Sequence, residues 1–246
     1  MKYSKVIPGT FLSRPNRFIA HVLIDGKEEI VHVKNTGRCR ELLLPGATVY
    51  LYCAPEDSPR KTKYDLIAVK KGDRLINMDS QAPNAVAEEW LRKQYPNADI
   101  RREVFYGASR FDFRIIEGEK TTFLEVKGVT LEKENIAMFP DAPTERGLKH
   151  IKELISCKKQ GYEAAVLFVI KMKEIRAFRP NDLTHPAFGD ALRAAQAAGV
   201  RILAMDCIVT PDSLTIDSPV KIDLESGGNY GIHTARKAGG PDRAGL

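Results

Sequence analysis

Long apolar segments are missing from this 246-residue sequence. Its longest uninterrupted apolar run spans residues 164–170, whereas a helix that crosses a membrane needs about 20 such residues. The first 18 residues are interrupted by Pro8, Pro15 and two arginines, so they offer no continuous apolar stretch of the kind that secretory signals contain. We therefore expect a cytoplasmic protein without a membrane partner.

Cysteine is also scarce, and its spacing argues against zinc. The four cysteines lie at Cys39, Cys53, Cys157 and Cys207, which gives neither a CxxC pair nor a zinc-ribbon pattern. Free buried thiols are the expected state. A Walker loop, a GxSxG elbow, an HExxH motif and a dinucleotide fingerprint after a strand are absent as well.

The charge that is present is unevenly distributed. The chain has 38 Lys and Arg against 32 Asp and Glu, a net charge of +6, and 43% of its residues are apolar, which is typical of a globular protein. Residues 1–80 carry 14 basic and 9 acidic side chains, whereas the remainder is nearly balanced with 24 and 23. A nucleic-acid platform and a merely solvated basic surface both fit this excess.

The basic first third has the pattern of short β-strands. Apolar-rich runs at 17–24, 30–33, 48–53 and 64–69 are separated by turn signals such as Asp25-Gly26 and Pro45-Gly46. Five or so short strands within residues 1–80 predict a small, OB-like barrel. Its loops contain the basic residues that we expect to contact nucleic-acid phosphates, namely Arg38, Arg40, Lys61 and Lys63.

From residue 81 the pattern changes to alternating helices and strands. Helices are predicted from Pro83, where Asn84 can cap, over 143–160 with Thr144 or Asp141 as cap, and over 188–198. Strands are predicted at 103–106, 110–116, 121–130, 164–170 and 200–209, with a short one at 220–225. The alternation predicts an α/β sandwich with a mixed sheet over residues 81–225, followed by a mobile Gly-rich tail at 226–246.

Two of these strands bring acidic residues together. The segment SRFDFRIIEGEKTTFLEVKGVTL reads as a hairpin with its turn at Gly118-Glu119, and that register places Asp112 opposite Glu125. Period-two alternation then puts Asp112, Glu125 and Lys127 on a polar face. The opposite face, toward the core, receives Phe111, Phe113, Ile115, Leu124 and Val126.

Two opposed carboxylates repel each other by up to about 1 kcal/mol and need a compensating cation. Lys127, aided by Arg110 or Arg114, would supply it in a structural salt-bridge cluster. Alternatively Mg²⁺, which prefers hard oxygen ligands, would bind Asp112, Glu125 and the main-chain carbonyl of Val126. The spacing alone fits both interpretations.

The pattern of Asp112 followed by Glu125-x-Lys127 resembles the signature of the PD-(D/E)xK nuclease superfamily. Over residues 14 to 209 the chain is also similar to the sugar fermentation stimulation protein A family. The segments that carry this similarity are HVKNTGRCRELLLPG, RKTKYDL, PNAVAEEWL, YGASRFDF, LEVKGVTL, FPDAPTERGLKHIKEL and AGVRILAMDC. The resemblance implies an OB-like barrel, a PD-(D/E)xK-type domain, DNA binding and nuclease activity on DNA or RNA.

The resemblance also implies roles for single residues. Asp112 and Glu125 would be metal ligands, and Lys127 would orient or help deprotonate the attacking water. Glu89 would complete the acidic site, with Glu88 as the competing candidate about 100° away on the same helix. The helix over 143–160 places Arg146 and His150 on one face, where they would contact the scissile phosphate; the alternative is an exposed arginine and a partly buried histidine bonded to a carbonyl.

The sequence thus predicts a nuclease that depends on Mg²⁺ or Mn²⁺ and acts on DNA or RNA. A DNA-binding regulator without catalysis and a metal-dependent phosphohydrolase acting on nucleotides are the alternatives. The choice between a single chain and a homo-oligomer stays open at this point.

Overall fold

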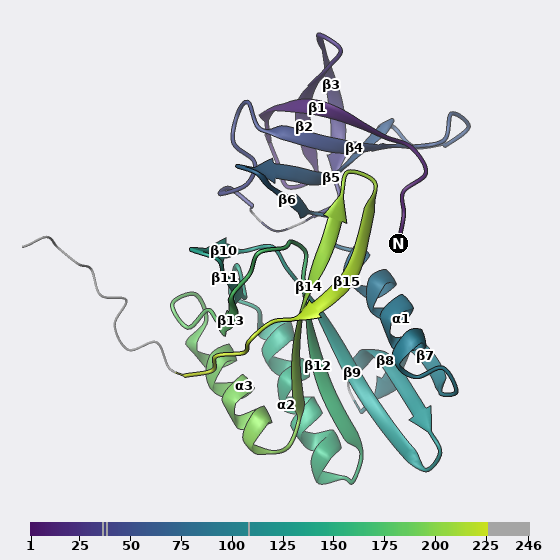
Figure 1. The fold of residues 1–246 in the computed structure, drawn as a ribbon, viewed down its shortest axis with the longest axis vertical. Helices are drawn as coiled ribbons and strands as arrows, with labels where there is room; N and C mark the ends of the chain where they lie inside the picture. The colour runs from purple at the N-terminus through teal and green to yellow at the C-terminus, as the bar shows by residue number, and fades with distance from the viewer. Residues whose placement is uncertain (36, 38, 108, 226–246) are drawn as a thin grey trace, which may run out of the picture.

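The computed structural model describes residues 1–35, 37, 39–107 and 109–225. Arg38, one of the expected phosphate contacts, and the tail at 226–246 therefore lie outside the described residues. Figure 1 shows an all-β unit at one end of the molecule and a larger α/β unit at the other, with a long hairpin reaching from the second to the first.

The all-β unit is built from strands β1 to β6 in the order β3-β2-β1-β4-β5-β6. Their bounds are β1 (Val6–Ser13), β2 (Ile19–Ile24), β3 (Lys27–Val33), β4 (Thr48–Cys53), β5 (Tyr64–Lys71) and β6 (Arg74–Asn77). A parallel pairing of β3 with β5 closes five of these strands into a barrel. Alternating apolar residues such as Val22 in β2 and Leu51 in β4 point inward and are fully buried. The OB-like barrel predicted from the sequence is confirmed.

Strand β1 was not among the predicted runs, because Pro8 and Gly9 at its centre are typical of turns. Gly9 is needed in the strand because of close packing. A Cβ added at this position would come within 2.6 Å of the Val22 side chain. The glycine thus marks a close approach between neighbouring parts of the barrel.

The α/β unit contains one large mixed sheet in the order β15-β14-β12-β9-β8-β7. Its strands are β7 (Asp99–Tyr106), β8 (Ser109–Glu117), β9 (Lys120–Val129), β12 (Glu163–Ile170), β14 (Arg201–Thr210) and β15 (Ser213–Pro219). Strands β9, β12 and β14 are mutually parallel, and the outer pairs are antiparallel. The mixed sheet that the sequence predicts is therefore confirmed, with the apolar strands β12 and β14 in its interior.

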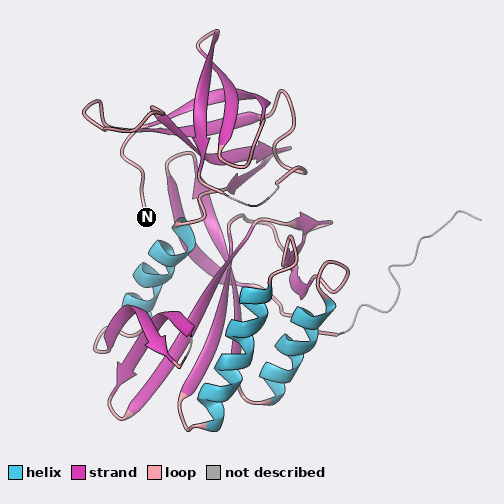
Figure 2. Cartoon of the chain, turned by 180° about the vertical axis from the view of Figure 1, so that it is seen from behind, coloured by secondary structure: helices cyan, strands magenta, loops and turns pink. Residues whose placement is uncertain are grey.

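Three helices cover this sheet: α1 (Ala82–Gln94), α2 (Glu145–Lys159) and α3 (Pro186–Ala197). Figure 2 shows α2 and α3 lying side by side, with α1 apart from them. Alternate residues of β12 belong to two different apolar clusters, Leu167 to the one that contains α1 and Phe168 to the one that contains α2 and α3. Both faces of the sheet are therefore covered by helices.

Two local predictions were wrong. Asn84 does not cap α1, since the N-cap is Gln81 and the amide of Asn84 bonds to a side chain of the sheet instead. The predicted strand at 220–225 contributes only an isolated bridge between Ile222 and Phe178. Besides β1, the strands that were not predicted are β6, β15 and a small sheet of β10 (Glu132–Lys133), β11 (Ile136–Phe139) and β13 (Ala177–Pro180).

The two units share one continuous core. A single apolar cluster includes Leu51 and Ile76 of the barrel together with Val129, Phe168 and Leu192 of the α/β unit. Polar contacts add to this junction, since buried Glu132 of the α/β unit pairs with Lys71 of the barrel at 2.5 Å and with Arg74 of the barrel at 3.2 Å. The barrel is therefore held in a fixed position against the α/β unit.

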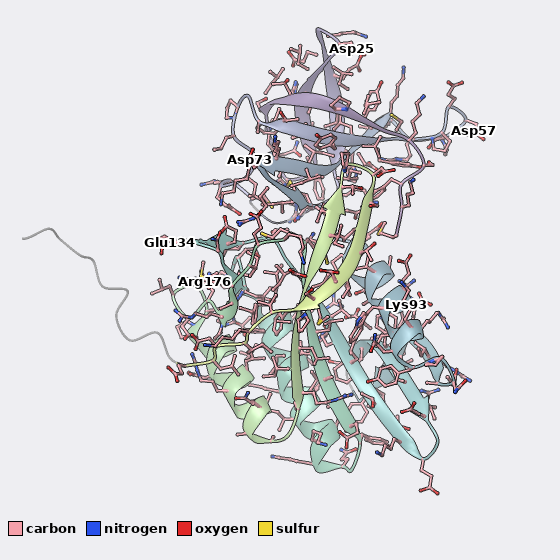
Figure 3. The ribbon with its side chains drawn as sticks, viewed as in Figure 1. Asp25, Asp57, Asp73, Lys93, Glu134 and Arg176 are labelled. Carbon is pink, nitrogen blue, oxygen red and sulfur yellow. The ribbon has the colours of Figure 1, made fainter. Side chains whose placement is uncertain are left out.

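Charged side chains cover the outside of both units. In Figure 3, Asp25, Asp57 and Asp73 stand at the tips of barrel turns, Lys93 on α1, and Glu134 and Arg176 beside the small sheet. Within the described part of the chain, no helix is long and apolar enough to cross a membrane.

Candidate functional site

The hairpin of β8 and β9 has the register that the sequence predicts. Glu117 lies opposite Lys120, and Phe113 lies opposite Leu124. Asp112 comes next in β8, and its Oδ2 accepts a hydrogen bond from the backbone N–H of Val126 at 2.8 Å. The carboxylate of Asp112 is thus bound to the backbone of the neighbouring strand.

Helix α1 holds the second oxygen of Asp112. The Oδ1 atom accepts a hydrogen bond from Nδ2 of Asn84, at 2.8 Å, in the first turn of the helix. A turn of α1 and the backbone of β9 thereby fix one carboxylate in one orientation. Asn84 is a site residue that the sequence interpretation assigned to a helix cap, because Asn directly before a helical pattern is a common capping signal.

Glu125 in β9 is the second carboxylate, and it is buried with 3% of its surface exposed. Its Oε1 accepts a hydrogen bond from Nζ of Lys127 at 2.6 Å and another from Nδ1 of His150 in α2. Because an ionised carboxylate only accepts, Nδ1 of His150 carries the hydrogen in this contact. Its other oxygen, Oε2, is buried and has no hydrogen-bond partner within the described residues.

The two carboxylates differ in their electrostatic surroundings. Burial raises the pKa of Asp112, and the negative charge of Glu125 raises it further. Burial would also raise the pKa of Glu125, but the hydrogen bond from His150 and the charge of Lys127 outweigh it and bring this pKa below its usual range. Glu125 therefore holds its negative charge more readily than Asp112, and a further cation would stabilise the charge of Asp112.

The predicted division into one core face and one open polar face is wrong. Phe113 packs in the apolar cluster of α1 as expected, but Phe111 packs in the opposite cluster, against His150 and Phe123. The pairing of β8 with β9 ends at Phe113 and Leu124, and beyond it the N–H of Val126 bonds to the side chain of Asp112. Since helices cover both faces of the sheet, Glu125 is buried and does not lie in an open cleft.

The donor set fits a hard divalent cation. The buried Oε2 of Glu125 has no hydrogen-bond partner within the described residues and lies beside a second carboxylate. A bound cation would compensate the cost of burying this charge. No group of three or more His, Cys, Asp or Glu side chains in the described ranges is arranged to hold a metal. A cation would thus be held by Asp112, Glu125 and the Val126 carbonyl, with water or phosphate oxygens as its other ligands, which is the pattern that Mg²⁺ prefers.

The structure does not bring Glu89 to this pair. Its carboxylate is about half exposed and pairs with the amino group of Met1 at 2.7 Å. Glu88 follows Asn84 by one helical turn and pairs with Arg92 at 2.6 Å and with Arg102 at 3.3 Å. Asn84 is thus the α1 residue that contacts the predicted site.

Helix α2 contributes His150 but holds it differently from the expected phosphate contact. Of the two predicted caps, Thr144 is the one that caps this helix, accepting a hydrogen bond from the N–H of Gly147 at 3.0 Å. Arg146 is exposed in the first turn, whereas His150 is 5% exposed and bonded to Glu125. His150 therefore orients the carboxylate of Glu125, whereas Arg146 is exposed to solvent.

The basic residues of the barrel line two separate hollows. Arg40 is exposed and lines one of about 450 Å³ together with Arg14 and Arg17. Lys61 and Lys63 are exposed and line another of about 490 Å³. The two hollows have no lining residue in common. A nucleic-acid strand that contacts Arg40 as well as Lys61 and Lys63 would therefore have to extend over both hollows.

A further cavity, of about 440 Å³, lies between the barrel and the α/β unit. Its lining includes Gly128 of β9, the residue after Lys127. It also includes Pro83 of α1, the residue before Asn84. Buried Lys171, at the end of β12, also lines it. Sequence reasoning missed Lys171, although a lysine that ends a continuous apolar strand is the available signal.

Two family models match the chain, and together they cover most of it. Residues 12–78 match the "SfsA N-terminal OB domain", and residues 81–213 match the "Sugar fermentation stimulation protein RE domain".

Relatives with known sequences or structures agree with the two family models. The chain is 58% identical to a "Sugar fermentation stimulation protein homolog" of Desulfitobacterium hafniense, over 92% of this chain and all of the relative. It is 55% identical to a homologue of the same name from Clostridium beijerinckii, over 91% of this chain and all of that one. A solved structure, described as Pyrococcus furiosus SfsA in complex with Ca²⁺, has a TM-score of 0.80 and 28% identity, covering 91% of this chain and 98% of that one. The chain belongs to the sugar fermentation stimulation protein (SfsA) family.

Proposed function

We propose that this chain is a nuclease that hydrolyses phosphodiester bonds of DNA or RNA with the help of Mg²⁺ or Mn²⁺. The observation that carries the proposal is the buried, unpartnered Oε2 of Glu125 next to the carboxylate of Asp112. A buried carboxylate oxygen without a partner is costly, and a divalent cation would satisfy it.

The chain's own residues prepare this site for phosphate chemistry. Asn84 and the Val126 N–H hold Asp112, while His150 and Lys127 hold Glu125. Mg²⁺ or Mn²⁺, when bound, would supply Lewis acidity to a water and to a phosphate oxygen. The side chain of Lys127 is 14% exposed, and its ammonium beside the pair can hold a proton and stabilise negative charge on a phosphate.

A solved relative supports a cation in this fold. The description of the Pyrococcus furiosus protein names Ca²⁺ as its partner in that structure. Calcium, like magnesium, prefers carboxylate, carbonyl and water oxygens. The donors that Asp112, Glu125 and Val126 offer are of this kind.

The barrel would hold the strand. Its exposed basic residues, Arg40, Lys61 and Lys63, suit contacts with backbone phosphates, which supply affinity without sequence information. The carboxylates alone would repel a phosphodiester, so binding by a basic platform and neutralisation by a cation complement each other.

The proposal is tested with single- and double-stranded DNA and RNA in Mg²⁺, in Mn²⁺ and in chelator. We expect cleavage in one of the metals, none in chelator, and loss of cleavage in Asp112→Ala and Lys127→Ala. Lys120→Ala, at the exposed turn of the same hairpin, is the matched control and should cleave normally. Cleavage that survives Asp112→Ala would overturn the assigned site.

A second candidate is a DNA-binding regulator without catalysis, in which the acidic pair is structural. One observation favours it: Oε1 of Glu125 already contacts both Lys127 and His150, so part of its charge is compensated within the chain. Binding that persists in chelator, with no cleavage in any metal, would support this candidate over the nuclease.

A further inference from the structure

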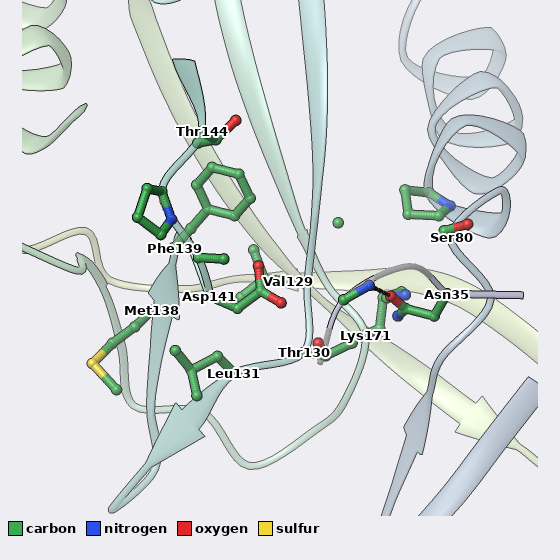
Figure 4. A pocket seen from close by; sticks show the side chains of 15 residues that line it. Asn35, Ser80, Val129, Thr130, Leu131, Met138, Phe139, Asp141, Thr144 and Lys171 are labelled. Carbon is green, nitrogen blue, oxygen red and sulfur yellow. Dashed lines mark hydrogen bonds between the residues drawn. The ribbon is translucent and has the colours of Figure 1, made fainter. Parts of the chain in front are cut away.

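The cavity between the barrel and the α/β unit has two chemically different sides. Figure 4 shows Leu131, Met138 and Phe139 on one side, and Asn35 and Lys171 on the other. A mixed lining of apolar side chains and a few polar groups, with a volume of about 440 Å³, lies within the range of pockets that bind small molecules.

Lys171 is the buried cation of this cavity. It is 2% exposed, and within the described residues its ammonium has one hydrogen bond, to the backbone carbonyl of Asp79 at 3.1 Å. An ammonium has three N–H donors, so the group retains capacity for an acceptor in the cavity. Burial lowers the pKa of Lys171 to about 8, which leaves it mostly protonated at neutral pH.

Asp141 supplies an acceptor in the same cavity. It is exposed, precedes α2 and belongs to the lining. Its negative charge is one of those that act on Lys171. In the view of Figure 4 its carboxylate lies between the apolar side and Lys171.

This combination favours a nucleobase over a phosphate group. A phosphate would meet the carboxylate of Asp141, and like charges placed together are unfavourable. A base that carries an amino group next to a carbonyl or ring nitrogen offers a donor for Asp141 and an acceptor for Lys171, while its flat face matches Phe139 and Met138. Cytosine, adenine and guanine meet this requirement, and uracil and thymine lack the amino group.

The position of the cavity suits a nucleotide next to the one being cut. Gly128, which lines it, follows Glu125 by three residues, or about 10 Å along an extended strand. Pro83 in the lining directly precedes Asn84, which holds Asp112. The elements that carry the proposed catalytic pair therefore also form the cavity.

We propose that this cavity receives one unstacked base of the bound strand, with Asp141 accepting from its amino group and Lys171 donating to the neighbouring acceptor. For the polymer, the inference rests on the proposed nuclease function. It implies that the preferred substrate is a single strand, an end or a locally opened duplex, since a base within a stacked duplex cannot enter.

The test uses the full chain in chelator, so that binding is measured without hydrolysis. CMP, AMP, GMP, UMP and base-free ribose 5-phosphate are titrated by nuclear magnetic resonance or calorimetry. We expect the amino-bearing nucleotides to bind about tenfold more tightly than UMP, the typical size of one specific base contact. Asp141→Ala, which removes the acceptor, should abolish this preference. Asp57→Ala, an equal charge change on an exposed barrel loop, should retain it.

Equal binding of ribose 5-phosphate and the nucleotides, or no binding at millimolar concentration, would overturn the inference. Since Lys171→Met removes a buried charge and can affect folding, the exposed Asp141 is the deciding variant. Mononucleotide binding that depends on Asp141, with no cleavage of any polymer, would support the cavity and refute the nuclease. Cleavage of a polymer, together with nucleotide binding that does not depend on the base, would support the nuclease and refute the base site in the cavity.

Discussion

Replacing Glu125 by Gln tests how the buried acidic pair is stabilised. The side chain keeps its shape, and its amide oxygen can still accept from Lys127 and His150 in place of Oε1. The negative charge is lost, so both contacts change from charge-assisted to ordinary hydrogen bonds. The repulsion on Asp112 is lost as well.

These changes give a magnitude for the free energy of unfolding. A hydrogen bond to a charged group contributes about 1.5–3 kcal/mol and a neutral one about 0.5–1.5 kcal/mol, so the two contacts lose roughly 2–3 kcal/mol together. Relief of the repulsion between the carboxylates returns up to about 1 kcal/mol. We therefore expect Glu125→Gln to destabilise the metal-free protein by about 2 kcal/mol at pH 7.

The difference should depend on pH in one direction. The pKa of Glu125 is lower in the folded chain, so its ionised form contributes stability above the unfolded pKa of about 4.3, and this contribution is lost as the pH falls through the folded value. The pKa of Asp112 is raised, so its contribution is present below the unfolded pKa of about 3.9 and is lost as the pH rises through the folded value. The difference between wild type and Glu125→Gln should therefore shrink from pH 7 toward pH 3.

The assay is denaturant unfolding of both proteins in chelator across this pH range. Glu89→Gln is the matched control, because its half-exposed ion pair with Met1 should contribute less than about 1 kcal/mol. A Glu125→Gln variant as stable as the wild type at pH 7, or a difference that stays constant down to pH 3, would refute the assignment of Glu125 as the ionised partner of Lys127 and His150.

Two other predictions concern the cation and the barrel. Mg²⁺ or Mn²⁺ should raise the melting temperature of the wild type, with about 2.7 kcal/mol of stabilisation at a hundredfold excess over Kd. Asp112→Ala should show no such rise, and an equal rise in both proteins would place the cation elsewhere. Neutralising Arg40, Lys61 and Lys63 together should reduce the slope of log K against log salt for nucleic-acid binding by about 2–3 units. An unchanged slope would exclude these residues from the binding surface.

The local fold was predictable where one strong pattern acts alone. The turn at Gly118 sets the hairpin register, so the pairing of Phe113 with Leu124 follows by counting. The cap of α2 was predictable as one of two residues, Thr144 or Asp141, because a side-chain oxygen at the helix start satisfies a nearby backbone N–H locally. Both are interactions between residues close in sequence.

The arrangement around Asp112 was not predictable, because it depends on partners from other elements. Alternation assigns Phe111 and Phe113 to the same face, but Phe111 belongs to the apolar cluster of α2 and α3 and Phe113 to that of α1. Asn84 has the pattern of a cap, and only the docking of α1 on the sheet shows it bonded to Asp112.

The cavity was invisible to sequence reasoning for a similar reason. Asp141 and Lys171 are 30 positions apart and face one space only after α2 and β12 are in place. Lys171 follows a continuous apolar strand, so its burial could have been suspected, but its neighbours come from the barrel junction.

Cleavage of nucleic acid by the purified chain is the direct test of whether the buried acidic pair and Lys127 form a nuclease site. The measurement is the rate at which new strand ends appear in Mn²⁺ or Mg²⁺, for the wild type and for Lys127→Ala. We predict metal-dependent cleavage by the wild type and a rate lower by about 10²–10⁴-fold in the variant, the usual contribution of a positioned proton-transfer group. No cleavage of any DNA or RNA substrate in either metal would contradict the proposed nuclease function, and equal rates for both proteins would contradict the role of Lys127.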